Sequence, residues 1–207
     1  MKLAVLGASG HGKVVADTAQ ACGWKQVDFF DDAWPTRQQN GHWEIIGDSA
    51  LLLTRLDDYD GVFIAIGNNR IRYGKLSELK SVGAKIVSLI HPHAVISQYA
   101  SIGIGSLVLA GVVVNVDAVI GRGVILNTGC SVDHDCVIHD GVHICPGARL
   151  AGGIEVGKLS WVGIGSSVRQ SLRIGTEVVI GAGAAVVTDI ADALTVVGVP
   201  ARVLFKT

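Results

Sequence analysis

The stretch LNTGCSVDHDCVIHDGVHICPGARL, residues 126–150, carries an aliphatic residue at every sixth position. The register continues in both directions and occupies Ile96, Ile102, Val108, Val114, Ile120, Leu126, Val132, Ile138, Ile144, Leu150, Val156, Val162, Val168, Ile174, Ile180 and Val186. A period of six fits neither an isolated helix nor a two-sided strand. It fits a parallel β-solenoid whose short strands each send one aliphatic residue inward, so that three hexads, about 18 residues, close one triangular coil.

Small residues mark the corners of this predicted solenoid. The fourth residue after an aliphatic position is often Ala, Ser or Cys, as at Ala118, Cys130, Cys136 and Ala148, which suits a tight corner with little interior space. We therefore interpret Cys130 and Cys136 as buried packing thiols. The four cysteines form no CxxC pair, which argues against a disulfide framework and is typical of a reducing compartment.

Composition narrows the class of protein. With 207 residues and 49% hydrophobic content, the chain is long enough for two small cores. A net charge of −1 without runs of Lys or Arg argues against partners such as nucleic acid or an anionic membrane. The apolar run after Met1 is too short for a signal peptide, and no run approaches the ~18 residues of a membrane span. We expect a cytoplasmic protein.

The first ninety residues follow a different pattern, in which strands alternate with helices. We expect strands over residues 2–6, 27–30, 59–66 and 85–90, and helices over residues 13–22, 49–56 and 69–82. Such alternation indicates a small parallel sheet. The sequence therefore predicts two domains: a Rossmann-like nucleotide-binding domain over residues 1–90 and the solenoid over residues 91–207.

The carboxyl ends of the predicted strands gather polar residues and glycines, where ligands bind in open parallel sheets. These positions are Ser9, Gly10, His11, Asp31, Asp32 and Gly67. The glycine-rich turn could cradle a phosphate at the start of a helix, and an acid about 20 residues farther on could bind a ribose or a base. The turn has the pattern G-x-x-G-x-G and not the G-x-G-x-x-G fingerprint of dinucleotide-binding domains. Ninety residues supply only one mononucleotide-binding half of such a domain, which favours a single nucleotide over NAD as the ligand. Alternatively, these glycines only close a strand–helix turn.

Two columns of residues lie outside the packed interior of the solenoid. Because residues one coil apart stack on each other, His134 aligns with Gly152 and Gln170. A second column, on another side of the triangle, contains Pro146, Ile164 and Ala182. The two columns cannot face each other within one chain. We infer a homotrimer that brings them together at its subunit interfaces.

The surroundings of His134 favour acyl transfer. A neutral imidazole can take a proton from an attacking amine or hydroxyl, and a free N–H at Gly152 could meet the developing oxyanion. Asp133 and Asp135 flank the histidine and could fix its tautomer. Sequence spacing does not decide which of them does so.

The chain resembles the hexapeptide-repeat sugar-nucleotide acetyltransferases, specifically the bacterial enzymes that N-acetylate a UDP-4-amino-4,6-dideoxy sugar on the route to N,N′-diacetylbacillosamine. The resemblance extends over the whole chain. It rests on His143 and on residues 7–14 (GASGHGKV), 65–72 (AIGNNRIR), 89–92 (LIHP), 132–136 (VDHDC) and 198–202 (GVPAR).

This resemblance implies a left-handed β-helix and a transfer in which the sugar 4-amine attacks acetyl-CoA directly, without an acyl-enzyme or a metal. It assigns His134 as general base and Asp135 as the acid that raises its basicity. It implies acetyl-CoA contacts at His143, Gly152, Ile164 and Ala182. It also implies contacts to the nucleotide sugar at Ser9, Gly10, His11, Asp31, Asp32 and Gly67.

Three other interpretations stay open. The same fold could acetylate a hydroxyl, as sialic acid O-acetyltransferases do. A trimeric zinc solenoid of the carbonic anhydrase type could use His134, His139 and His143, and a non-catalytic nucleotide-sugar-binding module is the third possibility. The sequence also leaves open the base (UDP, GDP or dTDP), the configuration at C4 and the glycan that receives the product.

Overall fold

The computed structural model describes residues 1–204 and divides into two compact units. The first is Met1–Pro92 and the second begins at His93. No helix in the described residues is long and apolar enough to cross a membrane.

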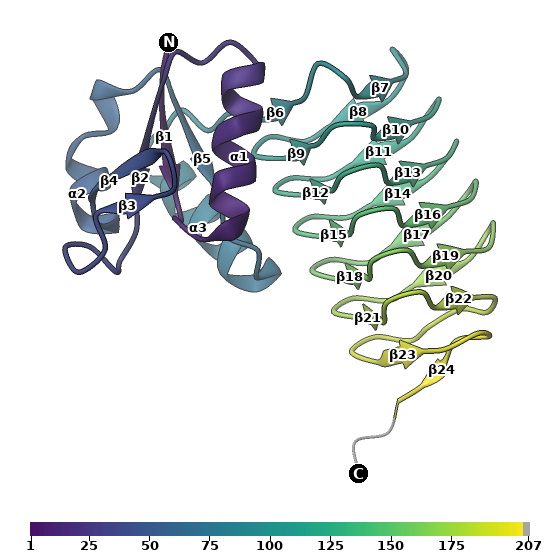
Figure 1. Cartoon of the computed structure of the whole chain (residues 1–207). Coiled ribbons are helices and arrows are strands. Elements are labelled where there is room, and N and C mark those ends of the chain that lie inside the picture. The colour runs from purple at the N-terminus through teal and green to yellow at the C-terminus, as the bar shows by residue number, and fades with distance from the viewer. Residues whose placement is uncertain (205–207) are drawn as a thin grey trace. The chain divides into compact units, whose positions relative to one another are not determined.

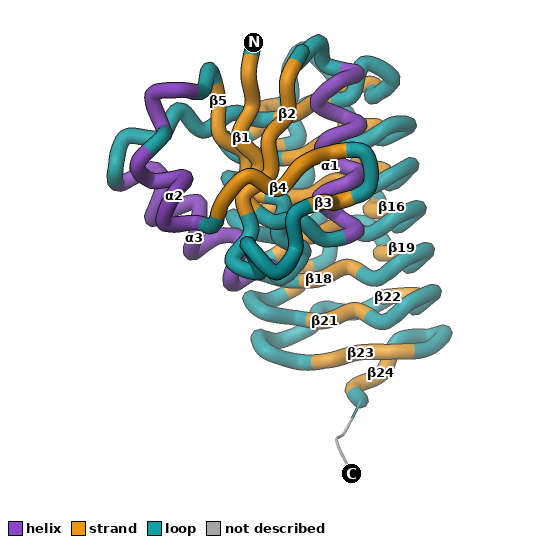
Figure 2. Tube along the Cα trace, turned by 60° about the vertical axis from the view of Figure 1, so that its left-hand side comes forward, coloured by secondary structure: helices purple, strands orange, loops and turns teal. Residues whose placement is uncertain are grey.

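The first unit is a five-stranded sheet with helices on both faces (Figures 1 and 2). Its strands lie in the order β3-β4-β2-β1-β5, and all are parallel except β3, which pairs with β4 in antiparallel fashion. They are β1 (Lys2–Leu6), β2 (Gln26–Phe30), β3 (Gln39–Asn40), β4 (Trp43–Gly47) and β5 (Gly61–Ile64). The helices are α1 (Gly10–Ala21), α2 (Ser49–Thr54) and α3 (Asn69–Ser81), with a 3-10 turn at Leu56–Asp58 and the short strand β6 at Leu89–Ile90.

Burial of consecutive residues in β1 shows that both faces of the sheet are covered. Successive side chains of a strand point to opposite faces, and Leu3, Ala4 and Val5 of β1 are all fully buried. Ala4 belongs to the core cluster that also contains Leu52 of α2 and Leu76 of α3. Helix α1 covers the opposite face (Figure 2).

The three expected helices and the first three expected strands are confirmed in order, with bounds that differ by a few residues. The strand over residues 2–6 is correct, and α1 begins at Gly10, three residues before its predicted start. The expected strand over residues 85–90 is mostly wrong, because only a bridge at Ile86 and the short strand β6 form there. The β3–β4 hairpin was not predicted, since residues 39–47 lack an alternating apolar pattern.

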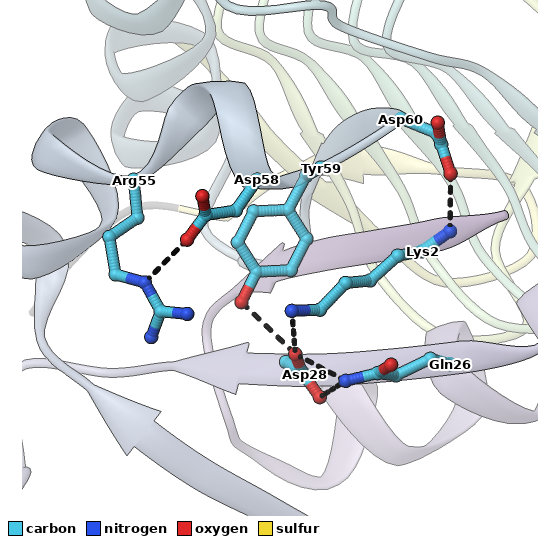
Figure 3. A network of polar contacts seen from close by, with 7 residues as sticks. All are labelled: Lys2, Gln26, Asp28, Arg55, Asp58, Tyr59 and Asp60. Carbon is cyan, nitrogen blue, oxygen red and sulfur yellow. Dashed lines mark hydrogen bonds and ion pairs between the residues drawn. The ribbon is translucent and has the colours of Figure 1, made fainter.

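A polar network centred on Asp28 links β1 and β2 to the segment that precedes β5 (Figure 3). Asp28 accepts a hydrogen bond from the Tyr59 hydroxyl at 3.0 Å and lies 3.4 Å from the Lys2 ammonium. The Gln26 amide donates to the same carboxylate. Burial, together with the charge of Asp28, raises the pKa of Tyr59, so the phenol stays a donor.

Replacing Tyr59 with phenylalanine should lower the free energy of unfolding by about 1 kcal/mol, because one partly buried hydrogen bond is lost while Asp28 keeps its other partners. Chemical denaturation measures this loss. Tyr99→Phe is the matched control, since Tyr99 is 67% exposed. An equal effect of both substitutions would contradict the structural role of the network.

The second unit is a left-handed parallel β-helix whose coils stack along one axis (Figure 1). One side contains β7 (Val95–Ile96), β10 (Val113–Val114), β13 (Ser131–Val132), β16 (Arg149–Leu150), β19 (Ser167–Val168) and β22 (Ala185–Val186). The second contains β8 (Ser101–Ile102), β11 (Val119–Ile120), β14 (Val137–Ile138), β17 (Glu155–Val156) and β20 (Arg173–Ile174). The third contains β9 (Leu107–Val108), β12 (Ile125–Leu126), β15 (His143–Ile144), β18 (Trp161–Val162), β21 (Val179–Ile180), β23 (Thr195–Val197) and β24 (Arg202–Val203).

The aliphatic residues that recur at every sixth position form the core of this β-helix, as predicted. Val132 pairs with Val114 on one side and Leu150 on the other, so one coil is 18 residues long. Cys130 and Cys136 are fully buried in the same core, in agreement with their interpretation as packing thiols. The last coil departs from the register, because Val196 pairs with Ile180 and β24 then runs antiparallel to β23.

Candidate active site

His134 stands at the corner that follows β13, and a carboxylate fixes its ring. Its Nδ1 lies 2.7 Å from Oδ2 of Asp135. Because a carboxylate only accepts, Nδ1 donates, and the neutral ring keeps its lone pair on Nε2. The His134 side chain is 56% exposed, and Nε2 makes no hydrogen bond within residues 1–204.

The two flanking aspartates have different partners. Asp133 accepts hydrogen bonds from the His134 backbone N–H at 2.9 Å and from the Asn115 amide at 2.8 Å. It therefore stabilises the corner, and its pKa is lowered by the bond from the His134 N–H. Asp135 contacts the imidazole, and this bond is the main cause that raises the pKa of His134.

The conformation of Asp135 explains why it reaches the ring of its neighbour. Its φ is 58°, in the left-handed region, as it is at Asp117 and Gly153, the residues one coil before and one coil after it. Aspartate tolerates this conformation better than most residues do. The corner thus aims the carboxylate back at Nδ1.

Gly152 lies directly beneath the imidazole, one coil farther along. A Cβ at this position would come within 2.5 Å of both Cε1 and Nε2 of His134. Its φ is not in the left-handed region, in contrast to Gly153, so the need for glycine is steric. The Gly152 N–H makes no backbone hydrogen bond in the described part of the chain, which leaves a donor beside Nε2.

A separate, mainly apolar groove of about 390 Å³ opens on the side of the helix that contains β15, β18 and β21. It is lined by Asn127, His143, Cys145, Pro146, Trp161, Gly163, Ile164, Val179, Ile180, Gly181 and Ala182. The structure therefore brings His143, Ile164 and Ala182 together in one groove. It places Gly152 elsewhere, with His134.

His143 is held rigidly at the inner wall of this groove. It is only 5% exposed, and its ring packs against Trp161 with centroids 4.3 Å apart. The Asn127 Oδ1 accepts from the Thr128 N–H, which directs the Asn127 amide nitrogen to His143 Nε2 at 3.0 Å. Because an amide nitrogen only donates, Nε2 accepts, and His143 is neutral with its proton on Nδ1.

The only cysteine in the groove lining is Cys145, which is 3% exposed. Burial raises the pKa of its thiol to about 12. The thiolate is the nucleophilic form of cysteine, so this thiol is unreactive near neutral pH.

The three histidines considered as zinc ligands have separate partners. Nδ1 of His134 contacts Asp135, Nε2 of His139 lies 2.9 Å from Glu155, and Nε2 of His143 contacts Asn127. Among the described residues, no group of three or more His, Cys, Asp or Glu side chains is arranged to hold a metal ion.

In the first unit, the start of α1 differs from the starts of the other two helices. The side chains of Asp48 and Asn68 cap α2 and α3 by accepting a backbone hydrogen bond. Ser9, the N-cap of α1, makes no such bond, and the first turn of α1 contains no acidic residue. The Ser9 side chain thus does not cap the first N–H groups of α1, and such a helix start can bind an anion.

The glycines of this region divide into two kinds. A Cβ at Gly12 would come within 2.5 Å of the Gly7 carbonyl oxygen, and Gly7 itself has a φ of 109°. These two glycines are explained by the turn alone. A Cβ at Gly10 or at Gly67 would meet no atom within 4 Å, so packing does not explain why these two positions lack a side chain.

Asp31 and Asp32 are both engaged with backbone groups. Asp31 accepts from the Ala8 N–H at 2.7 Å and from the Ala33 N–H at 3.0 Å. Asp32 accepts from the Ser49 N–H at 2.9 Å, and hydrogen bonds from Ser49 lower its pKa. Asp31 thereby joins the glycine-rich turn to the segment after β2, and Asp32 joins that segment to α2.

Comparison with known proteins identifies the family of this chain. The PglD N-terminal domain model matches residues 2–79, and the six-repeat model of bacterial transferase hexapeptides matches residues 117–152. The acetyltransferase domain of PglB from Neisseria gonorrhoeae FA1090 is 44% identical, with 98% of this chain and 99% of that domain covered and a TM-score of 0.92. The chain belongs to the hexapeptide-repeat sugar N-acetyltransferases.

Two further members of this family are similar over different lengths. A mutant of perosamine N-acetyltransferase from Caulobacter crescentus, solved with CoA and GDP-perosamine, is 36% identical over 100% of this chain and 98% of that one, with a TM-score of 0.94. The UDP-N-acetylbacillosamine N-acetyltransferase of Bacillus subtilis (strain 168) is 37% identical over 111 residues. That match spans about half of the curated relative, 51% of its length, and 52% of this chain.

In this acetyltransferase, sequence reasoning missed Arg72, which shapes the carboxyl end of β5. Arg72 is 1% exposed, and it donates to the carbonyls of Ile66 and Gly67 at 3.0 Å and to Asn69 at 2.9 Å. Burial, assisted by the charge of Arg72, lowers the pKa of His11 to about 4. His11 is therefore neutral at physiological pH. Nothing in the helical pattern of residues 69–82 marks Arg72 as buried.

Proposed function

We propose that the protein transfers the acetyl group of acetyl-CoA to the 4-amino group of a nucleotide-linked 4-amino-4,6-dideoxy sugar. The observation that carries this proposal is the arrangement of His134, whose Nδ1 is held by Asp135 while Nε2 stands beside the bare backbone of Gly152. The names of the relatives support an amino-sugar nucleotide as acceptor. We place UDP first, with a sugar of the N,N′-diacetylbacillosamine type.

The proposed reaction is a direct attack. The lone pair of the sugar amine forms a bond to the thioester carbonyl carbon, and the Gly152 N–H donates to the oxygen on which negative charge develops. His134 Nε2 accepts the proton that the amine loses. The C–S bond then breaks, and the proton on His134 balances the thiolate that leaves as CoA. A positioned base of this kind contributes about 10² to 10⁴ in rate.

The groove is the proposed site of acetyl-CoA, where His143, Ile164 and Ala182 would hold the cosubstrate together with Gly152 of the other column. Direct transfer is supported by Cys145, because a thiol with a pKa of about 12 does not form an acyl-enzyme. The four cysteines are free, which suits a reducing compartment such as the cytoplasm.

The site requires a second copy of the chain. His134 follows β13 and the groove lies along β15, β18 and β21, which belong to different sides of the coil. A homotrimer would place the groove of one subunit opposite His134 of the next. The acceptor would be held by the first unit at Ser9, Gly10, His11, Asp31, Asp32 and Gly67, with the phosphates at the start of α1.

Asp135→Asn should change the pH dependence of the reaction. The bond to Asp135 raises the pKa of His134, so in the wild type the base becomes protonated, and the rate falls, at a higher pH than for an isolated histidine. Asparagine tolerates the left-handed backbone at φ 58° but has no charge. We expect the acidic limb of kcat/KM to move to lower pH and the plateau to fall about tenfold.

A pH–rate profile of the two proteins measures this shift. His139, whose Nε2 contacts Glu155 outside both columns, supplies the control Glu155→Gln, which should leave the profile unchanged. An unchanged acidic limb in Asp135→Asn would show that Asp135 does not act on the catalytic base.

The function is tested by measuring CoA release with acetyl-CoA and a panel of acceptors. The panel contains UDP-, GDP- and dTDP-linked 4-amino-4,6-dideoxy sugars, a nucleotide sugar with hydroxyls only, and free sialic acid. We expect release with one 4-amino nucleotide sugar. Release only with a hydroxyl acceptor would assign the protein to O-acetylation, and no release with any acceptor would contradict an acetyltransferase role.

A further inference from the structure

The positively charged guanidinium of Arg37 is linked to the glycine-rich turn through the buried side chain of Asn40. Asn40 is 1% exposed, and its amide nitrogen donates to the Ser9 carbonyl at 3.1 Å. Its Oδ1 accepts from a terminal nitrogen of Arg37 at 3.1 Å. Asn40 therefore links the guanidinium of Arg37 to the residue that begins α1.

A second connection holds the backbone of the same segment. Asp31 bonds both to Ala8 in the turn and to Ala33, and the Arg37 N–H donates to the Ala33 carbonyl at 3.1 Å. The segment between β2 and β3 (Figure 2) is thus fixed to the turn at Asp31 and at Asn40. The Arg37 side chain is exposed, and its hydrogen bond to Asn40 uses only one of the several N–H groups of the guanidinium.

The charges around this point favour an anion. Lys13 lies in the first turn of α1, with its side chain beside Gly41, next to Asn40. The carboxylates of Asp31 and Asp32 at the same edge each accept backbone hydrogen bonds, which reduces their repulsion of a nearby anion. The start of α1, which the Ser9 side chain does not cap, adds partial positive charge.

We infer that Arg37, oriented by Asn40, binds the diphosphate of the nucleotide sugar beside the start of α1. This inference rests on the proposed function, because it places the substrate of that reaction at this edge of the sheet. Arginine presents several N–H groups in a plane and forms paired hydrogen bonds to phosphate oxygens. Arg37 is thus a substrate-binding residue, and Asn40 is a positioning residue.

The test is the affinity of Arg37→Gln for UDP, GDP and dTDP, measured by titration calorimetry at about 0.1 M salt. Lys25→Gln is the matched control, because it removes one exposed charge of the same unit just before β2, at the opposite end of the strands. We expect Arg37→Gln to weaken binding of the preferred nucleotide at least about tenfold. Lys25→Gln should stay within about twofold of the wild type.

Steady-state kinetics separate a binding role from a structural one. Arg37→Gln should raise KM for the nucleotide sugar about tenfold and leave kcat and the KM for acetyl-CoA unchanged. Asn40→Asp should also raise that KM, because its carboxylate would pair with Arg37 and neutralise it. Wild-type affinity in Arg37→Gln would overturn the inference and leave the proposed function standing. A wild-type protein that binds none of UDP, GDP and dTDP would contradict the proposed function as well.

Discussion

Replacing His134 with alanine should lower kcat at least about a hundredfold, because it removes the group that accepts the proton of the attacking amine. The KM values should change little, since the imidazole acts on the reacting amine. His134 is more than half exposed and its Nε2 has no partner in the described residues, so the fold should tolerate the change. The measurement is steady-state CoA release with the preferred acceptor.

His139→Ala provides the matched control for this substitution. His139 is also partly exposed and also contacts a carboxylate, Glu155 at 2.9 Å, but it lies at a different corner of the coil. Its removal should leave kcat within about twofold of the wild type. Equal losses in both variants, or a fully active His134→Ala protein, would exclude His134 as the general base.

Gly152→Ala should lower kcat by about a hundredfold although the substitution adds a single methyl group. The new Cβ would overlap Cε1 and Nε2 of His134 at 2.5 Å, so the imidazole must move away from its place beside Asp135. A displacement of about 1 Å at a catalytic group can cost this much in rate. Because the ring is exposed and can swing into solvent, the melting temperature should fall by only a few degrees. This corresponds to a loss of about 1 kcal/mol in the free energy of unfolding.

A double-mutant cycle shows whether this loss acts through His134. In a His134→Ala background the methyl group has no ring to displace, so Gly152→Ala should cause little further loss. Gly74→Ala is the control substitution, because its Cβ would meet no atom within 4 Å. If the two losses multiplied, Gly152 would act independently of the imidazole, for example through its N–H alone.

The solenoid could be predicted in detail because its pattern is set by interior packing. Each aliphatic position from Ile96 to Val186 faces the same core, so the spacing in the sequence also predicted which residues stack, including Gly152 beneath His134. The prediction stops where the register does, at the shortened last coil. The sequence therefore predicts which residues face the core and which residues stack on each other wherever the same packing contact recurs in every coil.

The roles of single polar groups could not be read in this way. Asp133 and Asp135 are equivalent by spacing, and only the left-handed backbone at Asp135 directs its carboxylate to the ring. The contributions of Arg72 and Arg37 were equally hidden, because each depends on contacts with residues brought near by the fold. The hairpin that supplies Asn40 has too little alternation to be recognised as two strands.

The most direct test of the proposed function is to identify the product formed from acetyl-CoA labelled with ¹³C in the acetyl group. The wild-type protein would be incubated with the preferred 4-amino nucleotide sugar, and the position of the label determined by NMR. We predict an amide at the C4 nitrogen, with no label on a hydroxyl or on the protein. Label in an ester, on a cysteine of the chain, or only in free acetate would contradict direct N-acetylation of a nucleotide sugar.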